Sequence, residues 1–246
     1  MGSRRSVEHS MRLLAQYSGA AIFSVEYRLA PEHPFPCATD DAWSALRWIW
    51  RMAEQLQIDR SRILIGGDSA GGNLAAACAR RDRNMRLGTL KGQLLVYPVL
   101  SQCEPDVPGY HFSLKSYEIC PEQRVWIEAA ILSLKRTMEQ FRLYTRTAQE
   151  DHSPDSSPLL DRNFAGLPPT WIFSAEFDYL TQQARAYASL LAQAGVPVGI
   201  SVYRGMVHGF MNRLGQSPQA EWVHREMAKV IQWMAYDQSL ERMDLL

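Results

Sequence analysis

The chain has 246 residues, of which 46% are hydrophobic and 21% are charged. This composition is ordinary for a globular protein and excludes global disorder. Lys and Arg together number 26, as do Asp and Glu, so the formal net charge is zero and no nucleic-acid partner is predicted. The length favours a single domain over residues 1–246.

Composition and cysteine spacing also indicate the cellular compartment and whether a metal or cofactor is expected. No apolar run approaches the ~20 residues that span a bilayer, and the N-terminus lacks the apolar segment of a signal peptide. The cysteines at positions 37, 78, 103 and 120 are far apart and form no CxxC pair. Neither a zinc ribbon nor a disulfide framework is therefore predicted. We expect a cytoplasmic chain with no metal and no organic cofactor.

Apolar periodicity, glycines and prolines divide the chain into alternating elements. Gly19 ends the first helical pattern, and three prolines make 29–36 an irregular loop. The segments 101–121 and 145–158 are rich in turn residues. The predicted elements, in chain order, are a helix over 5–18, strand 20–27, helix 40–56, strand 62–66, helix 70–81, strand 93–97, helix 121–143, strand 170–175, helix 180–195, strand 198–203 and helix 220–236.

Strands that alternate with helices predict an α/β fold with a mostly parallel sheet flanked by helices. Ligands in such sheets bind at the carboxyl ends of the strands. The segments that follow the predicted strands are therefore the places to look for catalytic residues.

The segment Gly67-Asp-Ser-Ala-Gly71 follows a predicted strand and matches the pattern G-x-S-x-G. Between a strand and a helix this pattern forms a sharp, strained turn that exposes the serine hydroxyl. The Ala70 N–H then lies at the start of the helix, where it can donate to an oxyanion. The alternative is a glycine-rich turn that holds a phosphate, but the segment lacks the lysine of a P-loop.

A serine hydroxyl needs a base to remove its proton. In the α/β-hydrolase order the acid and then the histidine follow the serine. Among six histidines, only His208 follows a strand near the C-terminus. His224 lies in a predicted amphipathic helix, where it has a surface or packing role. His33 lies among prolines and fits a role in fixing its loop.

The remaining histidines, at positions 9, 111 and 152, are predicted to be surface residues. Two acids follow the strand 170–175 and could orient the histidine. Asp178 is preferred because it lies further into the loop, where it can accept the Nδ1–H of an imidazole. Glu176 also qualifies by position as the orienting acid. Its other interpretation is a structural role at the end of the strand.

These residues fall within stretches that resemble the hormone-sensitive-lipase-like carboxylesterases of the α/β-hydrolase superfamily. The resemblance implies an α/β-hydrolase fold and a triad of Ser69, Asp178 and His208. It implies hydrolysis of short- to medium-chain acyl esters without metal or organic cofactor. Similar esterases dimerise through the strand that corresponds to 198–203, which implies a homodimer. The matching stretches, in chain order, are VEYRLAPEHPFP (25–36), GDSAGGNL (67–74), YPV (97–99), SPL (157–159), GLPP (166–169), AEFD (175–178) and GMVHGF (205–210).

The sequence departs from the family pattern in two places. Family members carry a His-Gly-Gly-Gly loop whose amides form most of the oxyanion hole, and these 246 residues contain no such run. The family's first strands and N-terminal cap helices are also expected to be missing, because Met1-Gly2-Ser3 resembles the residues just after that loop. The segment 101–152 is longer and more polar than its family counterpart, so it either reshapes the pocket wall or is a surface insertion.

Two functions follow from this pattern. The first is a serine carboxylesterase whose activity is impaired or absent in this 246-residue form. The second is a catalytically silent binding or receptor-like protein on the same fold. The intact Ser69, Asp178 and His208 favour the esterase, whereas the absent glycine loop favours the silent protein.

Overall fold

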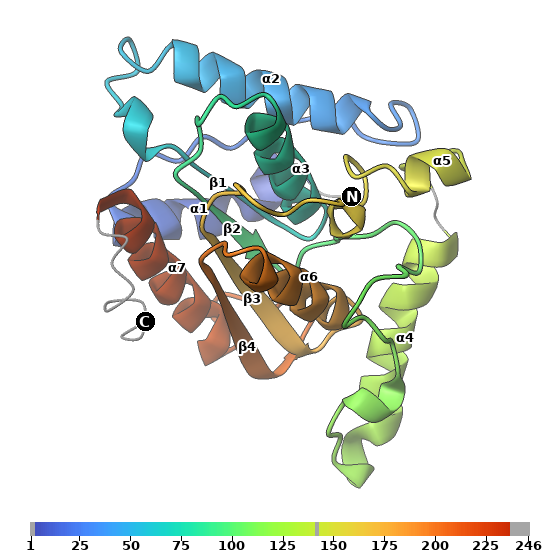
Figure 1. The fold of residues 1–246 in the computed structure, drawn as a ribbon. Helices are drawn as coiled ribbons and strands as arrows, with labels where there is room; N and C mark the ends of the chain where they lie inside the picture. The colour runs from blue at the N-terminus through green and yellow to red at the C-terminus, as the bar shows by residue number, and fades with distance from the viewer. Residues whose placement is uncertain (1–2, 141–142, 237–246) are drawn as a thin grey trace.

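A four-stranded parallel sheet forms the centre of the computed structural model, which describes residues 3–140 and 143–236 (Figure 1). The strands lie in the order β1-β2-β3-β4, and each pairs in parallel with the next. The predicted α/β class is therefore confirmed. The strand bounds are β1 Leu64–Asp68, β2 Gly92–Val96, β3 Thr170–Phe177 and β4 Val198–Val207.

Helices cover both faces of this sheet (Figure 1). One face packs against α2 (Cys37–Arg51), α3 (Ala70–Asn84) and α6 (Thr181–Gln193). The other face packs against α1 (Arg4–Ser18) and α7 (Pro218–Tyr236). None of the helices in the described ranges is long and apolar enough to cross a membrane.

Alternate residues of the central strands supply the two apolar clusters. Leu95 and Ile172 point to the α2, α3 and α6 side, whereas Val96 and Phe173 point to the α1 and α7 side. This period of two is the geometry of a strand whose two faces are both buried. It explains why the strands appear in the sequence as continuous apolar runs.

A third apolar cluster lies at the carboxyl ends of β3 and β4 and in the segment that follows β2. It includes Ile131 of α4 (Arg124–Gln140), together with Phe177 and Tyr179 beside the end of β3. Figure 1 shows α4 extending away from the sheet. The segment 101–152 therefore contributes to the surroundings of the strand ends. The shorter helices are α5 (Ala148–Asp151), η1 (Arg60–Arg62), η2 (Leu114–Ser116), η3 (Pro121–Gln123), η4 (Pro158–Leu160) and η5 (Phe210–Asn212).

The strand predicted over 20–27 is wrong. This segment is extended, but in the described residues it joins no sheet. β1 pairs with β2 along one edge and with no described strand along the other. Phe23 and Val25 are exposed to solvent. Its apolar residues are typical of a buried strand, but without a neighbouring strand the segment cannot form a hydrogen-bonded ladder.

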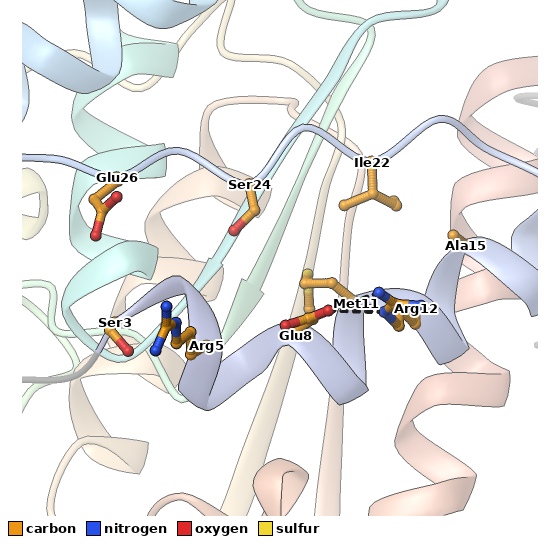
Figure 2. Close-up of a pocket in the computed structure, with 9 residues that line it drawn as sticks. All are labelled: Ser3, Arg5, Glu8, Met11, Arg12, Ala15, Ile22, Ser24 and Glu26. Atoms are coloured by element: carbon orange, nitrogen blue, oxygen red, sulfur yellow. Dashed lines mark hydrogen bonds and ion pairs between the residues drawn. The ribbon is translucent and has the colours of Figure 1, made fainter.

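A hollow of about 800 Å³ separates this extended segment from α1. Figure 2 shows Ile22 and Ser24 directed across it toward α1, and Met11 directed back toward the segment. Ser69, Asp178 and His208 do not line this hollow.

Most of the other predicted elements are present with shifted ends. α2 begins at Cys37 rather than at residue 40 and ends at Arg51 rather than at residue 56. The Met52 amide still donates to the Trp48 carbonyl, after which the chain turns. The turn-rich stretch 145–158 contains the single turn α5, which begins with a capping box between Thr147 and Glu150. The helix predicted over 121–143 is present as η3 and α4 up to Gln140; residues 141–142 lie outside the described residues, and Leu143 is not helical.

The turn between β1 and α3 depends on two glycines. A Cβ on Gly67 would lie 2.3 Å from the carbonyl of Gly71, and a Cβ on Gly72 would lie 2.8 Å from the Cβ of Pro98. A Cβ on Gly71 would meet no atom within 4 Å. Close backbone approach therefore excludes side chains at positions 67 and 72, but not at position 71.

Substitution at these glycines should separate steric need from motif membership. Gly67→Ala should destabilise the fold by about 1–3 kcal/mol or more, because the backbone of α3 cannot move away from the new Cβ. Gly71→Ala lies in a helix with open space around it, so it should stabilise by about 0.5–1 kcal/mol. Urea unfolding midpoints measure both effects. An equal loss of stability in the two variants would contradict this account.

His224 is fully buried in α7. Its Nδ1 donates to the Ala220 carbonyl at 2.5 Å, and its Nε2 has no hydrogen-bond partner among the described residues. Burial lowers the pKa of this imidazole below its ordinary value of 6.5. The folded state therefore holds His224 neutral, whereas the unfolded chain takes up the proton once the pH falls below about 6.5.

Stability should fall as the pH is lowered from neutrality through this range, because proton uptake by His224 favours the unfolded state. His224→Phe removes the titrating group and should flatten the dependence of the unfolding free energy on pH. Met227→Leu, a conservative change in the same apolar cluster, should shift stability by a similar amount at every pH. Denaturant unfolding between neutral and mildly acidic pH tests this. A parallel pH dependence in the wild type and His224→Phe would refute the role of His224.

Candidate active site

Ser69 stands between the last residue of β1 and the first residue of α3. Its backbone has φ 54° and ψ −114°, a region that residues other than glycine rarely adopt. Two backbone hydrogen bonds hold the turn: Ser69 N–H donates to the Val96 carbonyl at 2.9 Å, and Val99 N–H donates to the Ser69 carbonyl at 3.1 Å. The strained turn expected from the sequence is present, and Ala70 begins the helix immediately after it.

His208 follows the last residue of β4 and faces Ser69. The Ser69 Oγ lies 2.9 Å from the His208 Nε2, and the His208 Nδ1 lies 2.7 Å from the Asp178 Oδ2. A carboxylate oxygen accepts, so Nδ1 carries the proton and Nε2 accepts from the serine hydroxyl. The structure thus brings together the three side chains that the sequence singled out, from three separate strand ends.

Asp178 and Glu176 occupy different positions, although only one residue separates them. The Asp178 side chain is fully buried. Its Oδ1 accepts from the Leu180 N–H at 2.9 Å, which leaves Oδ2 directed at His208. Glu176 instead accepts from the Gly205 N–H at 2.7 Å. Glu176 therefore ties the end of β3 to the chain that leads to His208, and Asp178 faces the imidazole.

Two further residues beside the triad were not singled out by sequence reasoning. The Tyr97 ring packs against the His208 ring, with centroids 4.7 Å apart. Asp68 precedes Ser69, and burial raises the pKa of its carboxyl while a hydrogen bond from Asn212 and the nearby His208 act in the opposite direction. Both residues lie in the stretches that resemble the family. Their residue types alone do not indicate that they lie beside His208.

Asn73 connects the serine turn to the loops around it. It lies in the first turns of α3, and its Nδ2 donates to the Val99 carbonyl at 3.0 Å and to the Ser156 carbonyl at 2.7 Å. Asn73 is buried, so these bonds satisfy donors that could not reach water. The turn at Ser69 is thereby fixed from the loop after β2 and from the loop after α5.

The other histidines lie outside this cluster. His9 and His111 are exposed, as the sequence predicts, and His224 has the packing role that was one of its two predicted alternatives. His152 is also exposed, but it contacts Cys103, which the sequence did not suggest. Across residues 3–140 and 143–236, no group of three or more His, Cys, Asp or Glu side chains is arranged to hold a metal ion.

Comparison with known proteins places this arrangement in a family. A family model described as the alpha/beta hydrolase fold matches residues 1–212. Among curated proteins, the chain is 36% identical over 222 residues to "Esterase LipI" of Mycobacterium tuberculosis, covering 89% of this chain and 65% of that protein. It is 37% identical over 206 residues to "Ethyl acetate hydrolase" of Pseudomonas putida, covering 82% of this chain and 59% of that protein.

Solved structures agree with these matches. The carboxylesterase EstE1, cloned from a metagenomic library, has a TM-score of 0.80 at 32% identity, covering 96% of this chain and 76% of that one. An esterase from Pyrobaculum calidifontis also has a TM-score of 0.80 at 32% identity, covering 96% and 73%. The chain thus spans less than two thirds of the two curated relatives and about three quarters of these solved chains. On the strength of the family match and the shared fold, the chain belongs to the α/β-hydrolase family, as its resemblance to the hormone-sensitive-lipase-like carboxylesterases implies.

Proposed function

We propose that the chain carries the active site of a serine carboxylesterase that acts on short- to medium-chain acyl esters. The observation that carries this proposal is the chain of hydrogen bonds from Ser69 Oγ to His208 and on to Asp178. The four relatives and solved structures described above carry the names esterase, carboxylesterase or ethyl acetate hydrolase, which supports an ester as the substrate.

In this mechanism His208 removes the proton from Ser69 as its Oγ attacks the ester carbonyl. Asp178 holds the imidazole in the tautomer that accepts at Nε2, and it stabilises the imidazolium that forms. His208 then gives the proton to the leaving alcohol. Finally it activates a water molecule that hydrolyses the acyl-enzyme. The strained turn places the Ser69 hydroxyl beside His208 Nε2, so this proton transfer is direct.

The Ala70 N–H is the proposed oxyanion donor, because it is the first amide of α3 and lies next to the nucleophile. The family's His-Gly-Gly-Gly loop would supply further donors, and these 246 residues do not contain it. Loss of one such donor costs ~10²–10³ in rate. We therefore propose that this form turns over esters slowly or not at all, although its nucleophile is assembled.

Three wider features belong to the same proposal. The chain forms one α/β-hydrolase domain. Its outer strand β4 exposes Ile200 and Val202 at the edge of the sheet, an apolar edge that supports a homodimer formed there. All four cysteines are free, which supports a reducing compartment such as the cytoplasm.

Labelling with a fluorophosphonate probe tests the nucleophile directly. The probe should attach to Ser69 in the wild-type chain, because the serine and its base are already in contact. Ser69→Ala should abolish the labelling while leaving the fold intact. Hydrolysis of p-nitrophenyl acetate by the 246-residue chain should be ~100-fold or more slower than by hydrolases that contain the glycine loop.

The same experiment distinguishes the alternative function. A catalytically silent binding protein would give neither labelling at Ser69 nor any hydrolysis that depends on this serine. Labelling without turnover would mean that the nucleophile is active and that the oxyanion site limits the reaction. Labelling that persists in Ser69→Ala would contradict the assignment of the nucleophile.

Substitution of the two acids after β3 tests which of them orients the base. Asp178→Asn should lower kcat by about 10⁴, because the amide favours the wrong imidazole tautomer. Glu176→Gln should retain most activity, because its side-chain carbonyl still accepts from the Gly205 N–H. Rates of probe labelling measure this even where turnover is slow. An equal loss in both variants would overturn the assignment of Asp178.

A further inference from the structure

A second pair of a nucleophilic and a basic side chain lies outside the triad. Cys103 is in the loop after β2, and His152 directly follows α5. The Cys103 Sγ lies 3.8 Å from the His152 Nε2. Two segments 49 residues apart in the sequence therefore bring a thiol against an imidazole.

A backbone contact fixes which nitrogen faces the thiol. The His152 Nδ1 lies 2.7 Å from the Ala148 carbonyl oxygen, one turn back along α5. A carbonyl only accepts, so Nδ1 must carry the hydrogen, and the neutral ring presents an unprotonated Nε2 to Cys103. The base is thus oriented by a third group that belongs to neither of the two side chains.

The loop that carries Cys103 is held in place by its neighbours. The Gln102 N–H donates to the Ser157 Oγ at 2.8 Å, and that hydroxyl donates to the Asp151 carbonyl at 2.6 Å. The loops of the thiol and of the imidazole are therefore joined independently of the Cys103 contact itself. Cys103 is half-buried and His152 is exposed, so a small reagent in solvent can reach the pair.

The other three cysteines have surroundings that differ from the imidazole contact of Cys103. Cys120 is more exposed than Cys103, but its thiol donates to the Glu122 carboxylate at 2.5 Å. This thiol therefore faces a carboxylate and not an imidazole nitrogen. Cys78 is fully buried, and burial raises the pKa of its thiol to about 12. Cys37 is half-buried at the first residue of α2.

We propose that Cys103 is a nucleophilic modification site for soft carbon electrophiles of the α,β-unsaturated carbonyl class, with His152 as its base. His152 Nε2 takes the thiol proton, and the sulfur forms a bond to the β-carbon as the C=C π bond breaks. The resulting enolate then takes the proton back from the imidazolium at its α-carbon. The product is a neutral thioether, and neither an oxidant nor a leaving group is required.

N-ethylmaleimide, which belongs to this class, is the probe. The intact chain is treated with a limiting amount at neutral pH, and modification of each cysteine is followed in time by peptide mass spectrometry. Cys103 should react about tenfold faster than the more exposed Cys120, because an imidazole nitrogen can take the thiol proton at Cys103 as the sulfur attacks, whereas the thiol of Cys120 faces a carboxylate. Cys78 should remain unmodified, which reports that the chain stays folded.

His152→Gln keeps a side chain of similar length but removes the base. It should lower the rate at Cys103 to near that at Cys120, while the rate at Cys120 itself stays unchanged. His111→Gln, at an exposed position in the same segment 101–152, is the matched control and should alter neither rate. The proposal is overturned if Cys103 reacts no faster than Cys120, or if His152→Gln leaves its rate unaltered while Cys78 stays protected.

Discussion

The backbone of Ser69 adopts a positive φ that costs about 1–3 kcal/mol in an ordinary residue, and the surrounding structure is arranged to hold it there. β1 supplies the strand that enters the turn and α3 supplies the helix that leaves it. Val96 at the end of β2 and Val99 just after it form hydrogen bonds with the Ser69 backbone. Because the sheet is parallel, the ends of β3 and β4 meet the same edge, and this places Asp178 and His208 within reach of a fixed hydroxyl. The turn and the parallel sheet together determine where the three side chains meet.

Most of the order of elements, and the meeting of Ser69, Asp178 and His208, could be predicted from the sequence for a physical reason. Local patterns decide where a buried run of apolar residues ends, and in a parallel sheet the end of a strand is where a functional side chain must stand. The choice of Asp178 over Glu176 rested on one more step into the loop. That step matters because residue 176 still belongs to β3 and is used to hold Gly205, whereas residue 178 has left the strand.

Contacts between distant segments that no motif or strand end marks could not be predicted. The segment 20–27 has the apolar residues of a buried strand, but they describe one segment and a ladder needs two. The packing of Tyr97 on His208 and the meeting of Cys103 with His152 depend in the same way on how loops cross. The ends of some helices differ from the predicted ends because of local turns. α2 stops where the chain turns after Met52, although apolar residues continue beyond it.

The unequal crowding of the three glycines around Ser69 bears on how such serine turns are found in other sequences. The search pattern G-x-S-x-G fixes positions 67 and 71, yet only the first of these is closed to a side chain in this structure. The second sterically closed position is Gly72, which presses against Pro98 in the chain that follows β2. A pattern based on these contacts would therefore require glycine two residues before the serine and three residues after it. It would allow any residue at the equivalent of position 71. Homologous turns that carry alanine at the equivalent of position 71 would be missed by the usual text pattern, although their backbones could be identical.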